Sequence, residues 1–172
     1  MASLSLDHAY REAVRNWLKG EQWDIAASFL VPKRLMVHLE LKCIRADEVT
    51  LSRELTHCFN RLDRKVFGSA HRRKKIRVPR FVALERTDTV GWHAHALLRT
   101  PEHITPYQLS SKLGRLWLHQ LGKFGVGTFE DRLYWAEPVK GDYFNYSTKH
   151  VGGHGAADWL NMVIHSPRGL SA

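Results

Sequence analysis

Apolar residues recur at steps of three and four in three stretches of the chain, and this spacing predicts three amphipathic helices. The stretches are 7–19, 47–67 and 105–121, and a glycine, a common residue at helix ends, follows each of them directly. The third opens at Thr105-Pro106, and proline suits the first position of a helix. The segment 143–150 is predicted to form a further, shorter helix.

Shorter apolar or alternating runs predict the strands. These runs are 25–31, 35–44, 81–85, 92–98 and 133–136, and one or both of the first two are expected to be strands. The runs 81–85 and 92–98 are joined by a polar connector that contains a glycine, which is typical of an antiparallel hairpin. Strands thus alternate with helices, and the sequence predicts an α+β domain in which helices pack on one face of a largely antiparallel sheet.

The length and composition fit one domain over residues 1–172, with 1–20 as an N-terminal helical extension and 151–172 as a Gly-rich tail. Hydrophobic residues make up 44% of the chain, yet no apolar run reaches the roughly 18 residues that a membrane helix needs. The two cysteines form no Cys-x-x-Cys pair and the N-terminus lacks signal-peptide blocks, so we expect an intracellular protein. A phosphate-binding Gly-x-x-x-x-Gly-Lys-Ser/Thr loop is also absent, so any ATP-driven step would fall to a partner.

Positive charge is concentrated in one short stretch between a predicted helix and a predicted strand. The chain has 26 Lys and Arg against 17 Asp and Glu, a net charge of +9. Six of the basic residues, with no acid among them, lie in 71–80: Arg72, Arg73, Lys74, Lys75, Arg77 and Arg80. Such a cluster attracts polyanions, most commonly nucleic acid, although a solvated loop that only aids solubility has the same composition.

Two histidines two residues apart are the first candidate for chemistry. His93 and His95 lie in a predicted strand, where residues i and i+2 project from the same face and can reach one ion. Glu85 ends the preceding strand, and pairing of the hairpin would bring its carboxylate close to both rings. Two imidazoles and a carboxylate suit a divalent metal, whereas the alternative is a pair of hydrogen-bonded histidines with a purely structural role.

Two tyrosines on the last predicted helix are the second candidate. At about 100° per residue, Tyr143, Tyr146 and Lys149 share one broad face of that helix. The functional interpretation is a phenol nucleophile beside a cation, and a metal at the histidines would supply the activated electrophile that a weak nucleophile needs. The alternative is an aromatic face packed against the sheet.

The ordered set of Glu85, His93-x-His95 and Tyr146-x-x-Lys149 resembles the HUH endonucleases, in particular their replication-initiator (Rep) branch. The resemblance in motifs covers residues 81–150 and implies a ferredoxin-like or RRM-like sheet with helices packed on it. It also implies a site-specific nick in single-stranded DNA, in which Tyr146 attacks a phosphodiester and remains joined to the 5′ phosphate.

The resemblance implies roles for the remaining candidates. His93, His95 and Glu85 would bind Mg²⁺ or Mn²⁺, and Lys149 would assist. Tyr143 would be structural support or a second contributor, because family members with two tyrosines space them more widely.

The expected partners follow from the same resemblance. They are single-stranded DNA with its origin hairpin, held by the basic residues of 72–80, together with a host helicase and polymerase. Trp92 or Trp135 could stack an unpaired base, although tryptophan is more often a core residue. The compartment would be the bacterial or archaeal cytoplasm, or the host nucleus for a eukaryotic virus.

Alternatives remain open. An HUH transposase or relaxase would use the same chemistry, although relaxases usually have a third metal histidine in the place of Glu85. A DNA-binding regulator without catalysis would leave the histidines with a structural role. A two-histidine phosphodiesterase is disfavoured, because neither His93 nor His95 belongs to a His-x-Ser/Thr motif.

Overall fold

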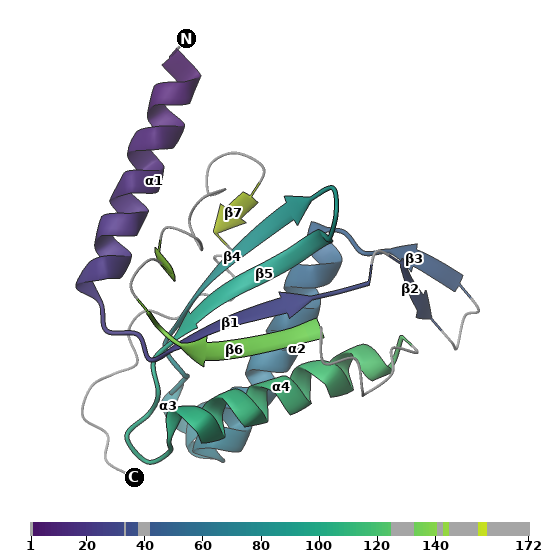
Figure 1. The fold of residues 1–172 in the computed structure, drawn as a ribbon. Coiled ribbons are helices and arrows are strands. Elements are labelled where there is room, and N and C mark those ends of the chain that lie inside the picture. The colour runs from purple at the N-terminus through teal and green to yellow at the C-terminus, as the bar shows by residue number, and fades with distance from the viewer. Residues whose placement is uncertain are drawn as a thin grey trace.

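The computed structural model describes residues 2–32, 34–37, 42–124, 133–140, 143–144 and 155–157. Its helices are α1 (Ala2–Gly20), α2 (Glu48–Phe67), α3 (Ala70–Lys74) and α4 (Pro106–Gly122). Its strands are β1 (Ile25–Leu30), β2 (Arg34–Val37), β3 (Lys42–Arg45), β4 (Arg80–Thr87), β5 (Gly91–Leu98), β6 (Tyr134–Pro138) and β7 (Gly155–Ala157). Figure 1 shows their arrangement.

Five of the strands form one sheet in the order β6-β1-β5-β4-β7, and every neighbouring pair in it is antiparallel. The chain connects four of these strands as β1–α2–β4–β5–α4–β6, the βαββαβ connection of ferredoxin-like domains. β2 and β3 form a separate two-stranded sheet. The predicted α+β class, with helices on an antiparallel sheet, is therefore confirmed.

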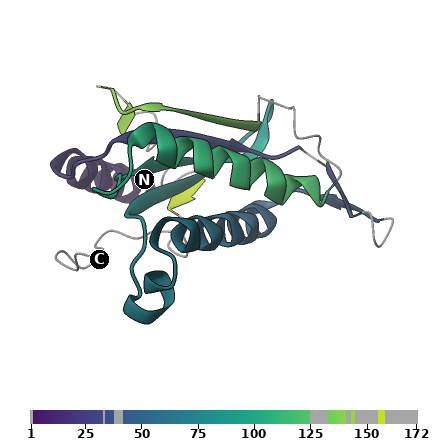
Figure 2. The same ribbon diagram turned by 90° about the horizontal axis from the view of Figure 1, so that it is seen from below.

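The helices α2 and α4 both begin at a residue whose side chain caps the helix, and α2 also ends at a glycine. Asp47 precedes α2 and its side chain accepts a hydrogen bond from the backbone N–H of Thr50 at 2.7 Å. Gly68, with a φ of 57° that glycine adopts easily, ends the same helix. Thr105 and Gln108 form a reciprocal capping box at the start of α4. Figure 2 shows these two helices running side by side.

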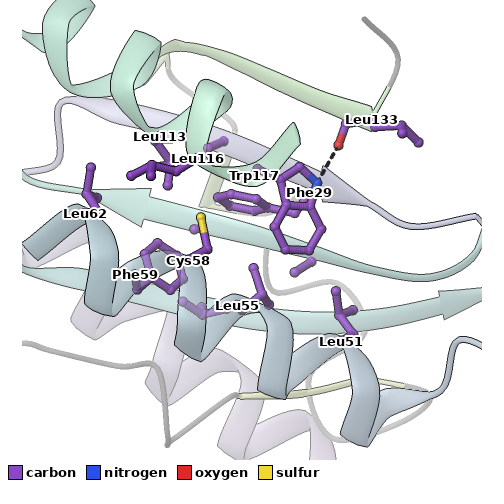
Figure 3. Packing of buried hydrophobic residues seen from close by; sticks show 14 of the residues in the cluster. Phe29, Leu51, Leu55, Cys58, Phe59, Leu62, Leu113, Leu116, Trp117 and Leu133 are labelled. Atoms are coloured by element: carbon purple, nitrogen blue, oxygen red, sulfur yellow. Dashed lines mark hydrogen bonds between the residues drawn. The ribbon is translucent and has the colours of Figure 1, made fainter. Parts of the chain in front are cut away.

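The main core lies between the sheet and the helices α2 and α4. Phe29 of β1 is fully buried there and packs edge-on against Phe59 of α2 and Trp117 of α4. The indole N–H of Trp117 donates to the carbonyl of Leu133 at 3.0 Å, as Figure 3 shows. This contact ties α4 to the start of β6.

A second, smaller core lies on the opposite face of the sheet. Leu97 of β5 and Phe81 of β4 meet Leu18 of α1 and Tyr143 there. The expected N-terminal extension 1–20 is thus a helix whose C-terminal end packs on the sheet. Because β-strand side chains alternate between faces, the two cores use alternate residues of the same strands.

The structure corrects three expectations about local structure. The alternating run 35–44 contributes to two strands, β2 and β3, which pair with Val37 opposite Lys42, because alternation alone does not show where one strand ends. The basic stretch begins as the short helix α3 rather than a loop, consistent with the high helix propensity of Arg and Lys. Within the tail 151–172, Gly155–Ala157 forms a strand that pairs with β4.

The helix predicted over 143–150 lies outside the described residues except for Tyr143 and Phe144. Across the described ranges, no helix has the length and hydropathy needed to cross a membrane.

Candidate metal centre

Glu85, His93 and His95 come together at the centre of the sheet. Glu85 of β4 lies directly opposite His93 of β5 in the strand register, and His95 follows two residues further on the same face. The carboxylate oxygen Oε2 of Glu85 lies 3.3 Å from Nε2 of His93 and 3.2 Å from Nε2 of His95. One donor atom from each of the three residues lies within 4.8 Å of the others. Glu85, His93 and His95 are all buried residues, with 3%, 6% and 2% of their surface exposed.

The far nitrogen of each ring has its own hydrogen-bond partner. Nδ1 of His93 donates to the carbonyl oxygen of Gly91 at 3.1 Å, since a carbonyl can only accept. Nδ1 of His95 lies 3.0 Å from the hydroxyl of Ser28 on β1. Such outer contacts fix the orientation and the tautomer of metal-ligating histidines. Both Nε2 atoms consequently face the carboxylate.

This arrangement concentrates acceptor atoms. Neutral His93 carries its proton on Nδ1, so the lone pair of its Nε2 points toward Oε2 of Glu85. Both atoms are hydrogen-bond acceptors, and at 3.3 Å they repel each other unless a cation lies between them. A divalent metal ion or additional protons meet that requirement. Because two imidazoles and one carboxylate form a typical ligand set for divalent metals, the residues fit such an ion.

Ser28 is the member of this group that the sequence analysis missed. It is a polar residue within the apolar run 25–31, and its register partner on β5 is His95. The interruption of an apolar run is the signal that could have identified it, but the partner strand was needed to connect it with a histidine.

The face of the sheet that carries these residues also carries an exposed tryptophan. Trp135 of β6 pairs with Ser28, which in turn pairs with His95, so the three side chains form a row across neighbouring strands. Trp135 is 48% exposed. Trp92 instead packs against the main core on the helix side of the sheet. Of the two expected stacking residues, only Trp135 lies on the face of the metal group.

Tyr143 lies in the smaller core and is 9% exposed. Its hydroxyl donates to the carbonyl of Ala27 on β1 at 3.4 Å. This burial and hydrogen bond agree with structural support, one of the two roles considered for Tyr143. Tyr146 and Lys149 lie outside the described residues.

The basic cluster divides into exposed and buried members. Arg72, Arg73 and Lys74 are exposed on α3, Lys75 follows them, and Arg77 is half-buried. Arg80 is different: its side chain is 1% exposed and forms an ion pair with Asp63 of α2 at 3.0 Å. Because a residue enclosed in this way has no access to a ligand, Arg80 is removed from the candidate nucleic-acid surface.

Comparisons with known proteins show a distant similarity to a solved structure. No protein-family model matches the chain, and no curated protein sequence does. Among solved structures, the chain is similar to the N-terminal nuclease domain of non-structural protein 1 from minute virus of mice, with 16% identical residues and a TM-score of 0.39. The similarity covers 76% of this chain and 73% of that chain.

The viral domain is described as having a unique Zn²⁺ coordination in its active-site pocket and a novel mode of DNA recognition at the origin of replication. At a similarity this low, the function of the present chain has to be argued from its own residues.

Proposed function

We propose that this protein is a metal-dependent nuclease that nicks and rejoins single-stranded DNA to initiate replication. The observation that carries the proposal is the buried group of Glu85, His93 and His95, with its donor atoms within 4.8 Å of one another on a ferredoxin-like sheet. A purely structural pair of histidines would not require a buried carboxylate directed at both Nε2 atoms. The motif resemblance to HUH replication initiators supplies the reaction class.

In this proposal, Glu85 Oε2 and the Nε2 atoms of His93 and His95 hold Mg²⁺ or Mn²⁺. The carbonyl of Gly91 and the hydroxyl of Ser28 keep the rings in their ligating orientation. When bound, the ion supplies Lewis-acid polarisation of a phosphodiester oxygen.

The proposed nucleophile is Tyr146, with Lys149 stabilising the phenolate. The phenol oxygen forms a bond to phosphorus, and the bond between phosphorus and the 3′ oxygen breaks. The phenol proton is released, the 3′ oxygen takes up a proton and leaves as a hydroxyl group, and the 5′ phosphate remains joined to Tyr146. Attack by another 3′ hydroxyl reverses the step and rejoins the strand.

Two described neighbours of Tyr146 in the sequence support this assignment. Tyr143 packs on the face of the sheet that carries the metal group, and Gly155 pairs with Glu85 itself. On the same face, the exposed ring of Trp135 offers a surface on which an unpaired base can stack. The free 3′ hydroxyl would then serve a host polymerase, and a host helicase would separate the strands of a plasmid, virus or phage replicon.

The test is the formation of a covalent adduct. The protein is incubated with Mn²⁺ and a labelled pool of single-stranded DNA of random sequence, and the adduct is detected on a denaturing gel. We expect Tyr146→Phe and Glu85→Gln to abolish the adduct, and Tyr107→Phe, which changes an 80% exposed tyrosine of α4, to leave it intact.

Three outcomes would change the proposal. An adduct that persists in Tyr146→Phe moves the nucleophile to Tyr143 or elsewhere. Wild-type protein that binds DNA but forms no adduct is a regulator rather than a nuclease. Calorimetry showing no Mn²⁺ binding to the wild type would contradict the metal centre itself.

A further inference from the structure

A basic cleft lies on the helix side of the sheet, away from the metal group. It has a volume of about 600 Å³ and is bounded by α2, α3 and the C-terminal end of α4. In Figure 1, β1 and β5 pass in front of α2, and α3 lies beside the C-terminal end of that helix. The cleft and the metal group are therefore separated by the sheet.

The wall of the cleft that α2 contributes follows from helical geometry. His57, Asn60, Arg61 and Arg64 are spaced at i, i+3, i+4 and i+7, so they share one stripe of the helix. The stripe points away from the apolar face that packs on the sheet. α3 adds Arg72, so residues from two separate helices face the same space.

The cleft is cationic and carries no acidic lining residue among the described ones. Lys123, which directly follows α4, also lines it, but this ammonium is bound by the buried carboxylate of Glu54. Arg61 lies 3.1 Å from the ring of His119 through Nη1. The guanidinium groups of Arg64 and Arg72 make no hydrogen bond or ion pair with any described residue, and both side chains are exposed. They are therefore available for a ligand.

The arginine side chains that line the cleft favour a ligand with phosphate groups. Arginine presents planar pairs of N–H donors that match phosphate oxygens, and three arginines converge here from two helices. The volume lies in the range of clefts that hold nucleotide-sized ligands. Outside the cleft, α3 also carries the exposed Arg73 and Lys74, which point in other directions because successive helix residues are about 100° apart. Positive charge that continues beyond the cleft can contact further phosphates of a polymer, which a free nucleotide does not have.

We infer that the cleft between α2, α3 and α4 binds the phosphate backbone of a nucleic-acid segment on the side of the sheet opposite the metal group. The choice of nucleic acid as the polymer rests on the proposed function. The geometry and charge of the cleft do not depend on it. One sheet would thus separate the strand that is cut from a second segment that is held.

The experiment measures the affinity of the full chain for fluorescently labelled single-stranded and duplex oligonucleotides by anisotropy, over a series of salt concentrations. The test variant is Arg64→Ala/Arg72→Ala. The control is Lys65→Ala/Arg115→Ala, which removes two exposed charges from α2 and α4 outside the cleft. Mn²⁺ binding by calorimetry and the thermal unfolding midpoint show whether each variant is folded.

For the cleft variant we expect the affinity for at least one of the two oligonucleotides to fall about 10-fold or more. The negative slope of log K against log salt concentration should become less steep by about two, because two phosphate contacts are lost. The control should lose less than about 3-fold, and Mn²⁺ binding should be unchanged in both variants. Equal losses in the two variants would overturn the inference, because they would reflect total charge alone. A mononucleotide bound as tightly as the oligonucleotide would also overturn it and assign the cleft to a free nucleotide.

The variant Glu85→Gln separates this inference from the proposed function. It removes the carboxylate of the metal group and leaves the cleft intact. Unchanged nucleic-acid affinity in Glu85→Gln, together with a loss in the cleft variant, supports the cleft even if no adduct is ever formed.

Discussion

Removal of one partner of the Asp63–Arg80 ion pair should destabilise the fold strongly. Both side chains are buried, with 0% and 1% of their surface exposed. The guanidinium makes three hydrogen bonds of 3.0 to 3.1 Å to the carboxylate, and Asp63 also accepts the backbone N–H of Val78 at 2.9 Å. Arg80 further lies over the ring of Phe59, 4.5 Å from its centroid.

The loss of unfolding free energy in each variant depends on which charged group remains buried without its partner. Arg80→Met leaves the carboxylate of Asp63 buried and without its cation, which costs about 3–5 kcal/mol of unfolding free energy. For a chain of this length that corresponds to a fall of about 6–20 °C in the thermal midpoint. Asp63→Leu should have a similar effect, because it leaves the guanidinium buried. Arg73→Ala, a matched change at an exposed arginine of α3, should stay within about 0.5 kcal/mol of the wild type.

The double variant Asp63→Leu/Arg80→Met decides whether the reasoning is right. It removes both charges together, so the main remaining cost lies in the N–H and the carbonyl of Val78, which lose their hydrogen bonds to Asp63 and Arg80, at about 1–3 kcal/mol for each group left unpaired. Urea unfolding followed by circular dichroism gives the three free energies. A double variant that loses the sum of the two single losses would refute the reasoning, because the two groups would then act independently. DNA affinity of folded Arg80→Met should equal that of the wild type, since Arg80 is enclosed.

Three further outcomes are expected. Ser28→Ala should weaken Mn²⁺ binding about 10–100-fold in calorimetry, because the ring of His95 loses its hydrogen-bonded partner. Gly114→Ala should lower the unfolding free energy by about 1–3 kcal/mol in urea titrations, because an added Cβ would lie 2.7 Å from the ring of Tyr134. Burial raises the pKa of Glu54, but hydrogen bonds from a lysine and a glutamine lower it more, so the net pKa is lowered. The ionised carboxylate of Glu54 therefore contributes its full stabilisation of the fold at pH values above the ordinary glutamate pKa of about 4.3. This stabilisation is lost as the pH falls through the lower pKa of the folded state. In thermal melts over a pH series, Glu54→Gln should lack this part of the acid destabilisation.

Where local signals agreed, the sequence predicted the fold well. The helix α2 was predicted because apolar spacing and a glycine at its end coincide, and the structure adds Asp47 as its N-terminal cap. The candidate metal group was identified because its three residues lie within eleven positions on one hairpin, so a single turn determines their relative placement. Both cases depend only on residues close together in the chain.

Long-range contacts explain what could not be predicted. Arg80 lies in the same basic stretch of sequence, 71–80, as Arg72 and Arg73. Its ion-pair partner Asp63, however, lies 17 residues earlier in the chain, on α2. Whether an arginine ends in the core or in solvent depended on that pairing. The basic cleft likewise combines residues of α2, α3 and α4, and no spacing within one segment indicates that they share a space.

The position of the histidines on β5 has a consequence for how the site is maintained. β5 is the middle strand of the five-stranded sheet and is hydrogen-bonded on both edges, by β1 and by β4. The two histidines are thus preorganised by the most protected backbone of the described sheet, and all three described candidate ligands lie on strands. Release of the ion by denaturant should then coincide with loss of the whole sheet, so that metal dissociation and global unfolding occur as a single cooperative transition.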